Sequence, residues 1–442
     1  MNQEERRQKR HSETKTARLV FVVIILAFFV AAAGAVFGLR QFLFNDDGKE
    51  NDDFLADSDT EHLETDDTGA EEPPADTGQA APPVAEDPLY QQALSTVSGM
   101  TTEEKVAQLF FITPDSLTGY TNANVAGDTT KSIYQEYPVG GIIYLSGNLQ
   151  NTDQTKTMLG KMMDIAKERT GLPLLLGVDE EGGSVARIAG NPEFQIQNVG
   201  DMSAVGATGD AQKAHEVGTT IGAYLKGFGF NVNFAPVADV LTNPENTVIG
   251  KRSFGSDSQI VAGMVTSELM GLSEQGIFGA VKHFPGQGGT AGDSHEGTVT
   301  LEKTVDELLA EELVPFQHAI DAGVQIIMVS HMSLPNVTGD NTPASLSPKV
   351  MTDLLRGRMG YQGIIITDAL NMGAVTASYS SEQAAVAAIA AGADMVLMPQ
   401  DFKAAYQGVL DALANGTLSE ERINDAAAHV VKLKQQIQTA AQ

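Results

Sequence analysis

The stretch AHEVGTTIGAYLKGFGFNVNFAPVADV, residues 214–240, shows the sequence pattern on which the predicted fold rests. Its first part, residues 214–229, spaces apolar side chains as one face of a helix does, and it ends in Gly, a common helix stop. A short apolar run follows at once and reaches Asp239, as a buried strand does when it comes to the edge of a sheet. The stretch therefore predicts a helix that leads directly into a buried strand.

The same alternation of apolar runs and helical segments recurs along the chain. Helical spacing appears again in residues 258–276 and 304–323. The apolar runs are AQLFFIT (107–113), VGGIIYLSG (139–147), PLLLGVDEEGG (173–183), FNVNFAPVADV (230–240), FGAVKHFPG (278–286), VQIIMVSHMS (324–333), GIIITDALNMG (363–373) and ADMVLMPQ (393–400). Continuous apolar strands that alternate with helices are typical of a parallel sheet covered on both faces. We therefore predict an α/β fold, a single (β/α)₈ TIM-type barrel over residues 89–442, with a doubly wound open sheet as the alternative.

The first 39 residues have the pattern of a membrane anchor. Residues 1–18 contain six Lys and Arg, and residues 19–39 contain no charged residue. Twenty-one residues at ~1.5 Å each can span a hydrocarbon core of ~30 Å. The basic flank predicts that residues 1–18 stay in the cytoplasm and that the rest lies outside the cell membrane. Cleavage as a signal peptide, followed by secretion, is the alternative.

Residues 40–88 form an acidic segment between the predicted anchor and the barrel. Within residues 45–87 there are sixteen Asp and Glu against one Lys, together with several Pro and few apolar residues. Such a segment cannot bury enough apolar surface to fold, and like charges extend it, so we predict a disordered linker. The net charge of the whole chain is −29, which argues against nucleic-acid binding.

The composition also limits the chemistry. The chain contains no Cys, which excludes disulfides, thiolate metal sites and a cysteine nucleophile. No G-x-G-x-x-G, Walker or HExxH motif appears at a strand end. We therefore expect neither a cofactor nor a metal ion. No G-x-S-x-G motif is present, so a serine hydrolase is also disfavoured.

Polar side chains follow most of the predicted strands. In a (β/α)₈ barrel the loops after the strands build the active site on one rim. The residues at these ends are Asp179, Glu181, Asp239, Lys282, His283, His331 and Asp368. Convergence of so many titratable groups is hard to explain by helix capping alone, and it predicts a catalytic site.

Two groups suit glycoside hydrolysis. Asp368 directly follows the apolar run GIIIT, so a strand would hold its carboxylate rigidly, as a nucleophile requires. Asp293 lies two residues before His295 on a Gly-rich loop, where a carboxylate can orient an imidazole for proton transfer. A carboxylate nucleophile with a mobile acid/base is the pattern of a retaining glycosidase.

The sequence closely resembles glycoside hydrolase family 3, in particular its β-N-acetylglucosaminidase (β-N-acetylhexosaminidase) branch. The resemblance rests on five motifs in order along the chain and extends over about residues 89–434. The motifs are GVDEEGG, FAPVADV, VIGKRSFG, KHFPGQG with the following DSH, and ITDALNMGAV. Many relatives have a second domain that supplies an acidic acid/base residue. Only 74 residues follow Asp368 here, too few for that domain, so the proton donor is expected within the barrel.

The resemblance implies a role for individual residues. Asp368 matches the catalytic nucleophile, His295 the acid/base and Asp293 its partner. The residues that match the binding of the terminal N-acetylglucosamine are Asp179, Arg187, Arg252, Lys282 and His283. The sequence departs from the common family pattern at Ser184, where Arg is frequent, and at Gln287, where His is frequent.

The implied activity is that of an exo-acting, retaining β-N-acetylglucosaminidase. The expected substrate is a glycan with a terminal β-linked N-acetylglucosamine, derived from peptidoglycan or related to it. Three alternatives remain open: a β-glucosidase or β-xylosidase, a glycoside phosphorylase on the same barrel, and a catalytically silent wall-binding module.

Overall fold

The structure is a computed structural model that describes residues 87–292, 297 and 299–440. The predicted anchor at residues 19–39 lies outside the described residues, as do Asp293 and His295. Helix α2 (Pro88–Ser98) begins one residue before the predicted start of the barrel, and Asp87 Oδ1 accepts a hydrogen bond from the N–H of Leu89 at 2.9 Å. None of the helices in these described ranges is both long and apolar enough to cross a membrane.

Eight parallel strands form one nearly closed sheet. Their order is β10-β1-β2-β3-β6-β7-β8-β9, and a parallel bridge between Ile366 and Met395 joins the two outer strands. The strands are β1 (Phe110–Ile112), β2 (Gly141–Tyr144), β3 (Leu175–Val178), β6 (Val232–Asn233), β7 (Phe278–Phe284), β8 (Ile326–Val329), β9 (Ile364–Thr367) and β10 (Val396–Leu397). Each of the eight predicted apolar runs contains one of them. The joined ends favour the predicted TIM-type barrel over the open sheet.

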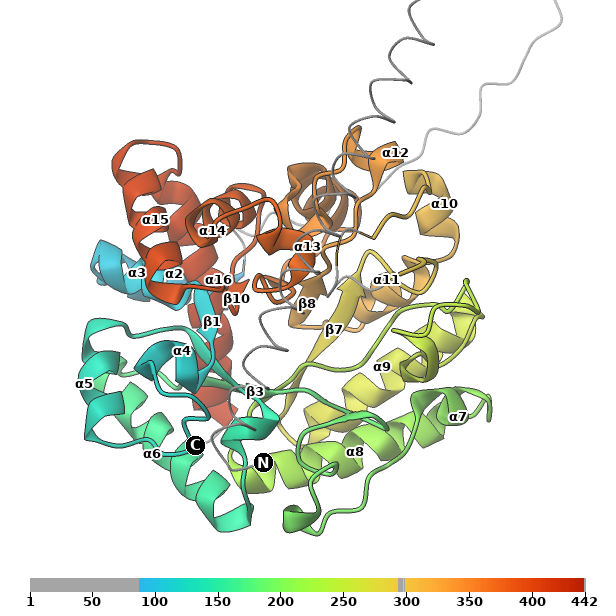
Figure 1. The fold of residues 1–442 in the computed structure, drawn as a ribbon, viewed down its shortest axis with the longest axis horizontal. Coiled ribbons are helices and arrows are strands. Elements are labelled where there is room, and N and C mark those ends of the chain that lie inside the picture. Colours follow the sequence, from blue (N-terminus) through green and yellow to red (C-terminus); the bar gives the residue numbers. More distant parts are fainter. Residues whose placement is uncertain (1–86, 293–296, 298, 441–442) are drawn as a thin grey trace, which may run out of the picture. The chain divides into compact units, whose positions relative to one another are not determined.

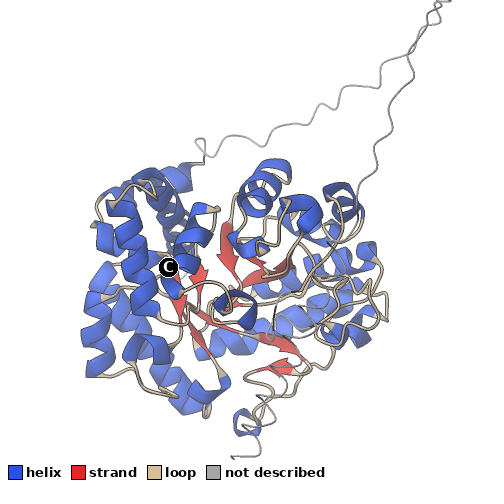
Figure 2. Cartoon of the chain, turned by 45° about the horizontal axis from the view of Figure 1, so that its top comes forward, coloured by secondary structure: helices blue, strands red, loops and turns tan. Residues whose placement is uncertain are grey.

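The strands are apolar throughout because both of their faces are buried. In β9, Ile364 and Ile366 pack into the cluster inside the sheet, whereas Ile365 packs into the larger cluster beneath the helices. Figure 2 shows the same layers, with the strands at the centre and the helices around them. This arrangement explains why the sequence shows continuous apolar runs instead of an alternating pattern.

Helices surround the strands in the order expected for a barrel (Figure 1). They are α3 (Thr102–Gln108), α4 (Pro114–Thr118), α5 (Asp128–Glu136), α6 (Thr152–Thr170), α7 (Met202–Gly206), α8 (Ala211–Phe228), α9 (Ser258–Glu274), α10 (Val305–Ala310), α11 (Val314–Asp321), α12 (Pro335–Thr338), α13 (Gly373–Thr376), α14 (Ser381–Ala390), α15 (Phe402–Ala414) and α16 (Glu420–Ala440). A short hairpin, β4 (Glu180–Gly182) with β5 (Val185–Ala186), follows β3. One π-helical segment, η6 (Lys349–Arg358), and the 3₁₀ turns η2 (Ser146–Asn148), η3 (Pro192–Phe194), η4 (Gly250–Arg252) and η5 (Ala344–Leu346) complete the elements.

The segment 304–323 differs from its prediction as one helix. It is divided into α10 and α11, with Glu311 between them at φ −140° and ψ −74°. Pro315 lies in the first turn of α11, where its missing N–H leaves no hydrogen bond unmade. In a continuous helix the same proline would remove a hydrogen bond and clash with the preceding turn, so the chain breaks before it.

Helix α16 packs across the end of the barrel opposite the carboxyl ends of the strands. Its Val430 and Leu433 belong to the same buried cluster as the inward-facing residues of the strands. Lys434, fully buried, donates a hydrogen bond from Nζ to Gln108 Oε1 at 2.6 Å. Burial of this ammonium group lowers the pKa of Lys434 to about 7. The interior of the barrel is therefore completed by a helix that follows all eight strands in the chain.

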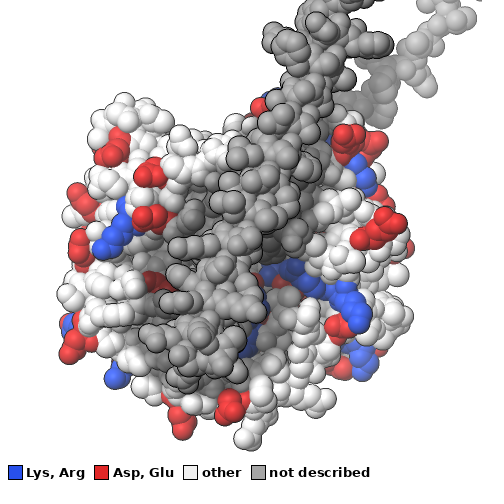
Figure 3. Space-filling model, viewed as in Figure 1, with Lys and Arg blue, Asp and Glu red and all other residues white. Residues whose placement is uncertain are grey.

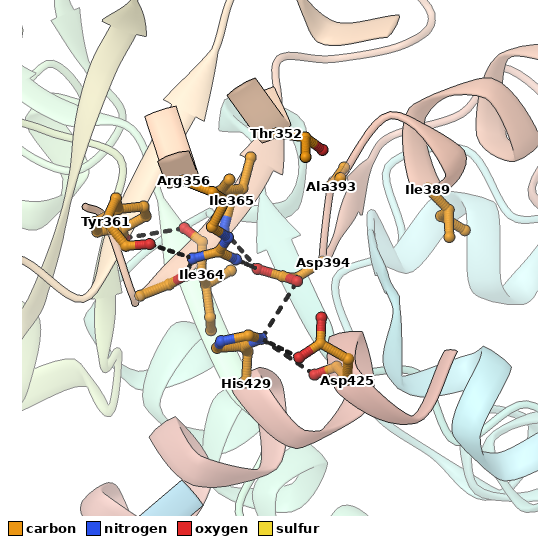
Figure 4. Close-up of polar contacts among 12 residues, drawn as sticks. Thr352, Arg356, Tyr361, Ile364, Ile365, Ile389, Ala393, Asp394, Asp425 and His429 are labelled. Atoms are coloured by element: carbon orange, nitrogen blue, oxygen red, sulfur yellow. Dashed lines mark hydrogen bonds and ion pairs between the residues drawn. The ribbon is translucent and has the colours of Figure 1, made fainter. Parts of the chain in front are cut away.

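A buried ion cluster ties α16 to β10 and to η6. Asp394 is fully buried just before β10, and its two carboxylate oxygens pair with Arg356 and Arg422. Figure 4 shows Asp394 between Arg356 and His429. His429 Nδ1 lies 3.4 Å from Asp394 Oδ1. Burial opposes ionisation of Asp394, but Arg356 and the other neighbouring cations hold its pKa far below the usual range.

The same cluster has ligand types that a metal ion could use. Ligand atoms of Asp394, Asp425 and His429 lie within 4.8 Å of one another. Arg356 and Arg422 already neutralise the buried carboxylate, however, and both reach it directly. The cluster therefore serves as an ion pair that joins three elements.

On the face shown in Figure 3, uncharged residues make up most of the described surface, and Asp and Glu side chains are spread around its rim. Lys and Arg side chains lie among them on both sides, with the largest group at the right.

Candidate active site

Most of the predicted site residues that the structure describes lie at or after the carboxyl ends of strands of the barrel. Asp179 follows β3, Lys282 and His283 lie in the last part of β7, and Asp368 follows β9. Arg252 comes from η4, in the loop after β6. In a parallel barrel these ends share one rim, so five residues that are up to 189 positions apart in sequence come together.

Lys282 lies between two carboxylates. Its Nζ is 2.9 Å from Asp179 Oδ1 and 2.6 Å from Glu181 Oε1, and its side chain is only 4% exposed. Burial disfavours the charged amine, but the attraction of Asp179 and Glu181 outweighs it, so the pKa of Lys282 lies above its usual value. Lys282 is therefore a fixed cation on the rim.

Arg252 makes a two-point contact with the same Glu181. The Nε and NH2 atoms of Arg252 each lie 2.8 Å from a different oxygen of Glu181. Burial raises the pKa of a carboxyl group, but Lys282 and Arg252 together lower the pKa of Glu181 to about 2. The two-point contact between Arg252 and Glu181 is a strong geometry for an ion pair of Arg and a carboxylate. Glu181 thus fixes the positions of two cations, Arg252 and Lys282.

His283 is oriented by a second buried carboxylate. Asp239 Oδ2 accepts a hydrogen bond from His283 Nδ1 at 2.6 Å, and Asp239 is fully buried. The other oxygen, Asp239 Oδ1, accepts from the backbone N–H of Gln287 at 2.6 Å. Arg252 NH2 lies 3.3 Å from His283 Nε2. The ring therefore has a fixed plane and position, as a binding or catalytic imidazole requires.

Arg187 reaches the site from the loop after β5. Its NH2 atom lies 3.9 Å from Asp179 Oδ2, and its Nε is buried with no hydrogen-bond partner among the described residues. Glu180 holds this loop in place, because its carboxylate accepts from the N–H groups of Ile188 and Ala189 at 2.8 Å each. Arg187 therefore offers an unused donor at the edge of the network.

Asp368 lies within electrostatic reach of this network. Burial raises the pKa of its carboxyl group, but attraction to the imidazoles of His331 and His283 and a hydrogen bond from the N–H of Ala369 (2.7 Å to Oδ1) bring the pKa of Asp368 below its usual value. The carboxylate is ionised at neutral pH, the state in which it can attack a carbon atom.

Both ends of the loop that carries Asp293 and His295 are anchored on the same rim. At its start, the N–H of Gln287 is bound to Asp239. At its end, Thr300 pairs with Ser333, just after β8, and Leu301 N donates to Ser333 O at 3.0 Å. Asp293 and His295 themselves lie outside the described residues, so their roles stay predictions.

Glu181 and Asp239 were recognised in the sequence only as polar strand ends, without a role. The structure shows that each holds predicted site residues in place: Glu181 fixes Lys282 and Arg252, and Asp239 fixes His283. Their position after apolar runs was the available signal. The sequence could not show which side chain each carboxylate contacts, because the partners lie 44 to 101 positions away along the chain.

Glu268 of α9 is a buried acid that the sequence analysis missed. It is 1% exposed, and neither of its carboxyl oxygens has a hydrogen-bond partner among the described residues. Burial, and next the negative charge of Glu181, raise the pKa of Glu268 to about 8. Its spacing from Val261, Val265 and Leu272 places it on the buried face of α9, and this spacing was the available signal.

Replacing Glu268 with Gln should stabilise the protein increasingly as the pH rises. The folded state keeps a proton on Glu268 that the unfolded chain releases above its usual pKa of 4.5, so the wild type loses stability between pH 4.5 and about 8. Gln cannot ionise, and the gain should reach roughly 2–4 kcal/mol near pH 8. Urea denaturation at several pH values measures it. The same change at Glu274, which is exposed on the same helix, is the control; an equal, pH-independent effect for both variants would refute the prediction.

Comparison with known proteins identifies the family. The family described as "Glycosyl hydrolase family 3 N terminal domain" matches this chain over residues 101–433. Beta-hexosaminidase A of Pseudoalteromonas piscicida is 34% identical over 326 residues, which are 68% of this chain and 54% of that protein. Beta-hexosaminidase LpqI of Mycobacterium tuberculosis is 33% identical over 313 residues, 69% of this chain and 78% of the relative.

A solved structure gives the same result. The family 3 β-N-acetylglucosaminidase from Paenibacillus sp. str. FPU-7 superposes with a TM-score of 0.73 and 38% identity, over 78% of this chain and 64% of that one. The chain thus spans 54% and 64% of the length of two of these relatives. Because the match to the family description covers most of the folded chain, the chain belongs to glycosyl hydrolase family 3.

Proposed function

We propose that the chain is an exo-acting, retaining β-N-acetylglucosaminidase. The observation that carries the proposal is the position of Asp368 at the carboxyl end of β9, on the same rim as the network that holds Lys282, Arg252 and His283. The names of the relatives from Pseudoalteromonas, Mycobacterium and Paenibacillus support a hexosaminidase. The fixed donors of the network would hold the hydroxyl groups of a terminal sugar, with Asp179 as acceptor and Arg187 as a further donor.

The reaction proceeds in two steps. A carboxylate oxygen of Asp368 attacks the anomeric carbon while His295, oriented by Asp293, gives its proton to the leaving oxygen; the glycosidic bond breaks and a glycosyl ester forms. Neutral His295 then takes a proton from water, whose oxygen attacks the same carbon and releases the carboxylate of Asp368. Two displacements at one carbon retain its configuration, and His295 regains its proton.

The substrate class is a glycan with a terminal β-linked N-acetylglucosamine, derived from peptidoglycan or related to it. The predicted anchor at residues 19–39 would place the activity outside the cell membrane, where such glycans occur. The proposal needs no metal ion or cofactor, because each step is carried by side chains.

A panel of p-nitrophenyl β-glycosides tests this function. We expect kcat/KM for the N-acetylglucosaminide to exceed that for the glucoside and the xyloside by about 10²-fold, because a site built around hydrogen bonds rejects a substrate that lacks them. Nuclear magnetic resonance of the first product should show the β-anomer. Faster release from the glucoside, or an α-anomer as first product, would contradict the proposal.

The same assay separates hydrolysis from phosphorolysis. With added phosphate, the proposed hydrolase still releases free N-acetylglucosamine. Formation of the sugar 1-phosphate at the expense of free sugar would instead identify the chain as a phosphorylase.

A further inference from the structure

A hollow of about 230 Å³ opens between the loops that follow β1, β2, β9 and β10, on the same rim as Asp368. We call it the amide pocket, because Asn122, Asn371 and Gln400 are among the residues that line it. Its volume lies below the ~300–1,000 Å³ of pockets that enclose drug-sized ligands, so it suits a group of about one sugar ring.

The amide pocket begins where the strand that carries Asp368 ends. Asn371 follows Asp368 by three residues, and its N–H donates to Met398 O at 3.1 Å. Met398, just after β10, also lines the pocket. A ligand in the pocket would therefore lie on the same rim as Asp368, on the side of β10 and β1.

The pocket is held by fixed polar contacts. Asn148 is 2% exposed and donates from Nδ2 to Asp115 Oδ1 at 2.7 Å, which joins the loops after β2 and β1. Asp115 Oδ2 accepts from the N–H of Asn122 at 2.5 Å. Met398 has φ 44°, a left-handed conformation that a residue with a side chain adopts only under constraint from its surroundings. Such strained residues are frequent at binding sites.

The lining is polar but almost without charge. The amides of Asn122, Asn371 and Gln400 each offer donors and an acceptor, which match sugar hydroxyl and acetamido groups. Among the described residues that line the pocket there is no Lys or Arg, and Asp115 is the single charged side chain. The pocket is therefore complementary to a neutral polar group and repels a carboxylate.

Two features next to the pocket extend it. Tyr120, two residues before Asn122, is 61% exposed, so its side chain is accessible to a ligand. A second hollow of about 330 Å³ shares Asp115, Ser116 and Gln400 with the amide pocket.

We propose that the amide pocket binds the sugar on the leaving-group side of the scissile bond, and that it selects a neutral sugar over one that carries a carboxylate. The inference rests on the proposed function, whose terminal sugar occupies the network around Lys282. The neutral amides contact the hydroxyl and acetamido groups of the second ring, and Tyr120 covers its apolar face.

Three substrates of the full-length protein test the inference. The first is N-acetylglucosaminyl-β-1,4-N-acetylmuramic acid, the second is the methyl ester of its carboxylate, and the third is N-acetylglucosaminyl β-fluoride, whose leaving group cannot reach the pocket. We expect kcat/KM for the ester to exceed that for the acid by roughly five- to tenfold. Gln400→Lys should remove or reverse this preference, because it adds a cation to the wall.

Variants of the lining provide a second measurement. Tyr120→Ala and Asn371→Ala should lower the ratio of kcat/KM for the ester to that for the fluoride by about five- to tenfold. Val125→Ala, which removes another exposed side chain from the same loop but does not line the pocket, should leave the ratio unchanged.

The two proposals fail in different ways. Absence of fluoride hydrolysis by the wild type would overturn the proposed function and the inference with it. Hydrolysis of the fluoride, with equal rates for ester and acid in both the wild type and Gln400→Lys, would overturn the inference alone. An unchanged ratio in Tyr120→Ala and Asn371→Ala would do the same.

Discussion

Asp368→Asn should lower kcat for an aryl β-N-acetylglucosaminide by roughly 10³–10⁵-fold, the scale of losing a nucleophile. Asn has nearly the same shape and can still accept the hydrogen bond from the N–H of Ala369, so the fold should be kept. The amide cannot form the glycosyl ester. Steady-state kinetics measure the loss, and urea denaturation checks that stability is retained.

The pH dependence of kcat and a control variant complete the test of Asp368. Because the pKa of Asp368 lies below its usual value, the wild type should keep its nucleophile ionised to a correspondingly lower pH. Asp353→Asn, an exposed aspartate of η6, should behave as wild type. An Asp368→Asn enzyme with more than a tenth of wild-type kcat would refute the assignment of the nucleophile.

Asp394→Asn should cost about 3–5 kcal/mol of the free energy of unfolding, since it leaves Arg356 and Arg422 buried without their carboxylate. The folded-state pKa of Asp394 lies far below the usual value, so its stabilising effect is present above the unfolded pKa and is lost as the pH falls below it. The difference between wild type and variant should therefore shrink on acidification.

Urea denaturation at pH 7 and at low pH measures both parts of this prediction. Asp425→Asn provides a graded comparison, because Asp425 is 39% exposed and water can replace part of its contacts. It should cost less than Asp394→Asn. Equal losses for the two variants, or a loss at Asp394 that does not change with pH, would argue against a buried ion cluster as the cause.

The sequence alone was sufficient to place the eight strands and the rim. Each apolar run is long enough for one buried strand, and burial on both faces makes the run continuous, so its signal is local. The break between α10 and α11 was less visible, since the helical spacing continues across Glu311 and only Pro315 indicates a stop. Its position in the first turn of a second helix becomes clear only from the structure.

The partners within the site could not be predicted in the same way. Lys282 meets Asp179, which lies 103 positions earlier, because the barrel brings β7 and β3 to one rim. Glu268 is the clearest gap, because its spacing from Val261 and Val265 places it on the apolar face of α9, but the spacing does not show which groups surround the carboxyl. Its environment depends on Glu181, another element entirely.

Helix α16 has a consequence for synthesis on the ribosome. Val430 and Leu433 fill the inside of the barrel, yet they are translated after the last strand, β10. A barrel that formed before they emerged would expose its apolar interior to water at one end. Exposed apolar surface promotes aggregation. We therefore expect a chaperone that binds ribosome-attached chains to be needed most while α16 is being synthesised.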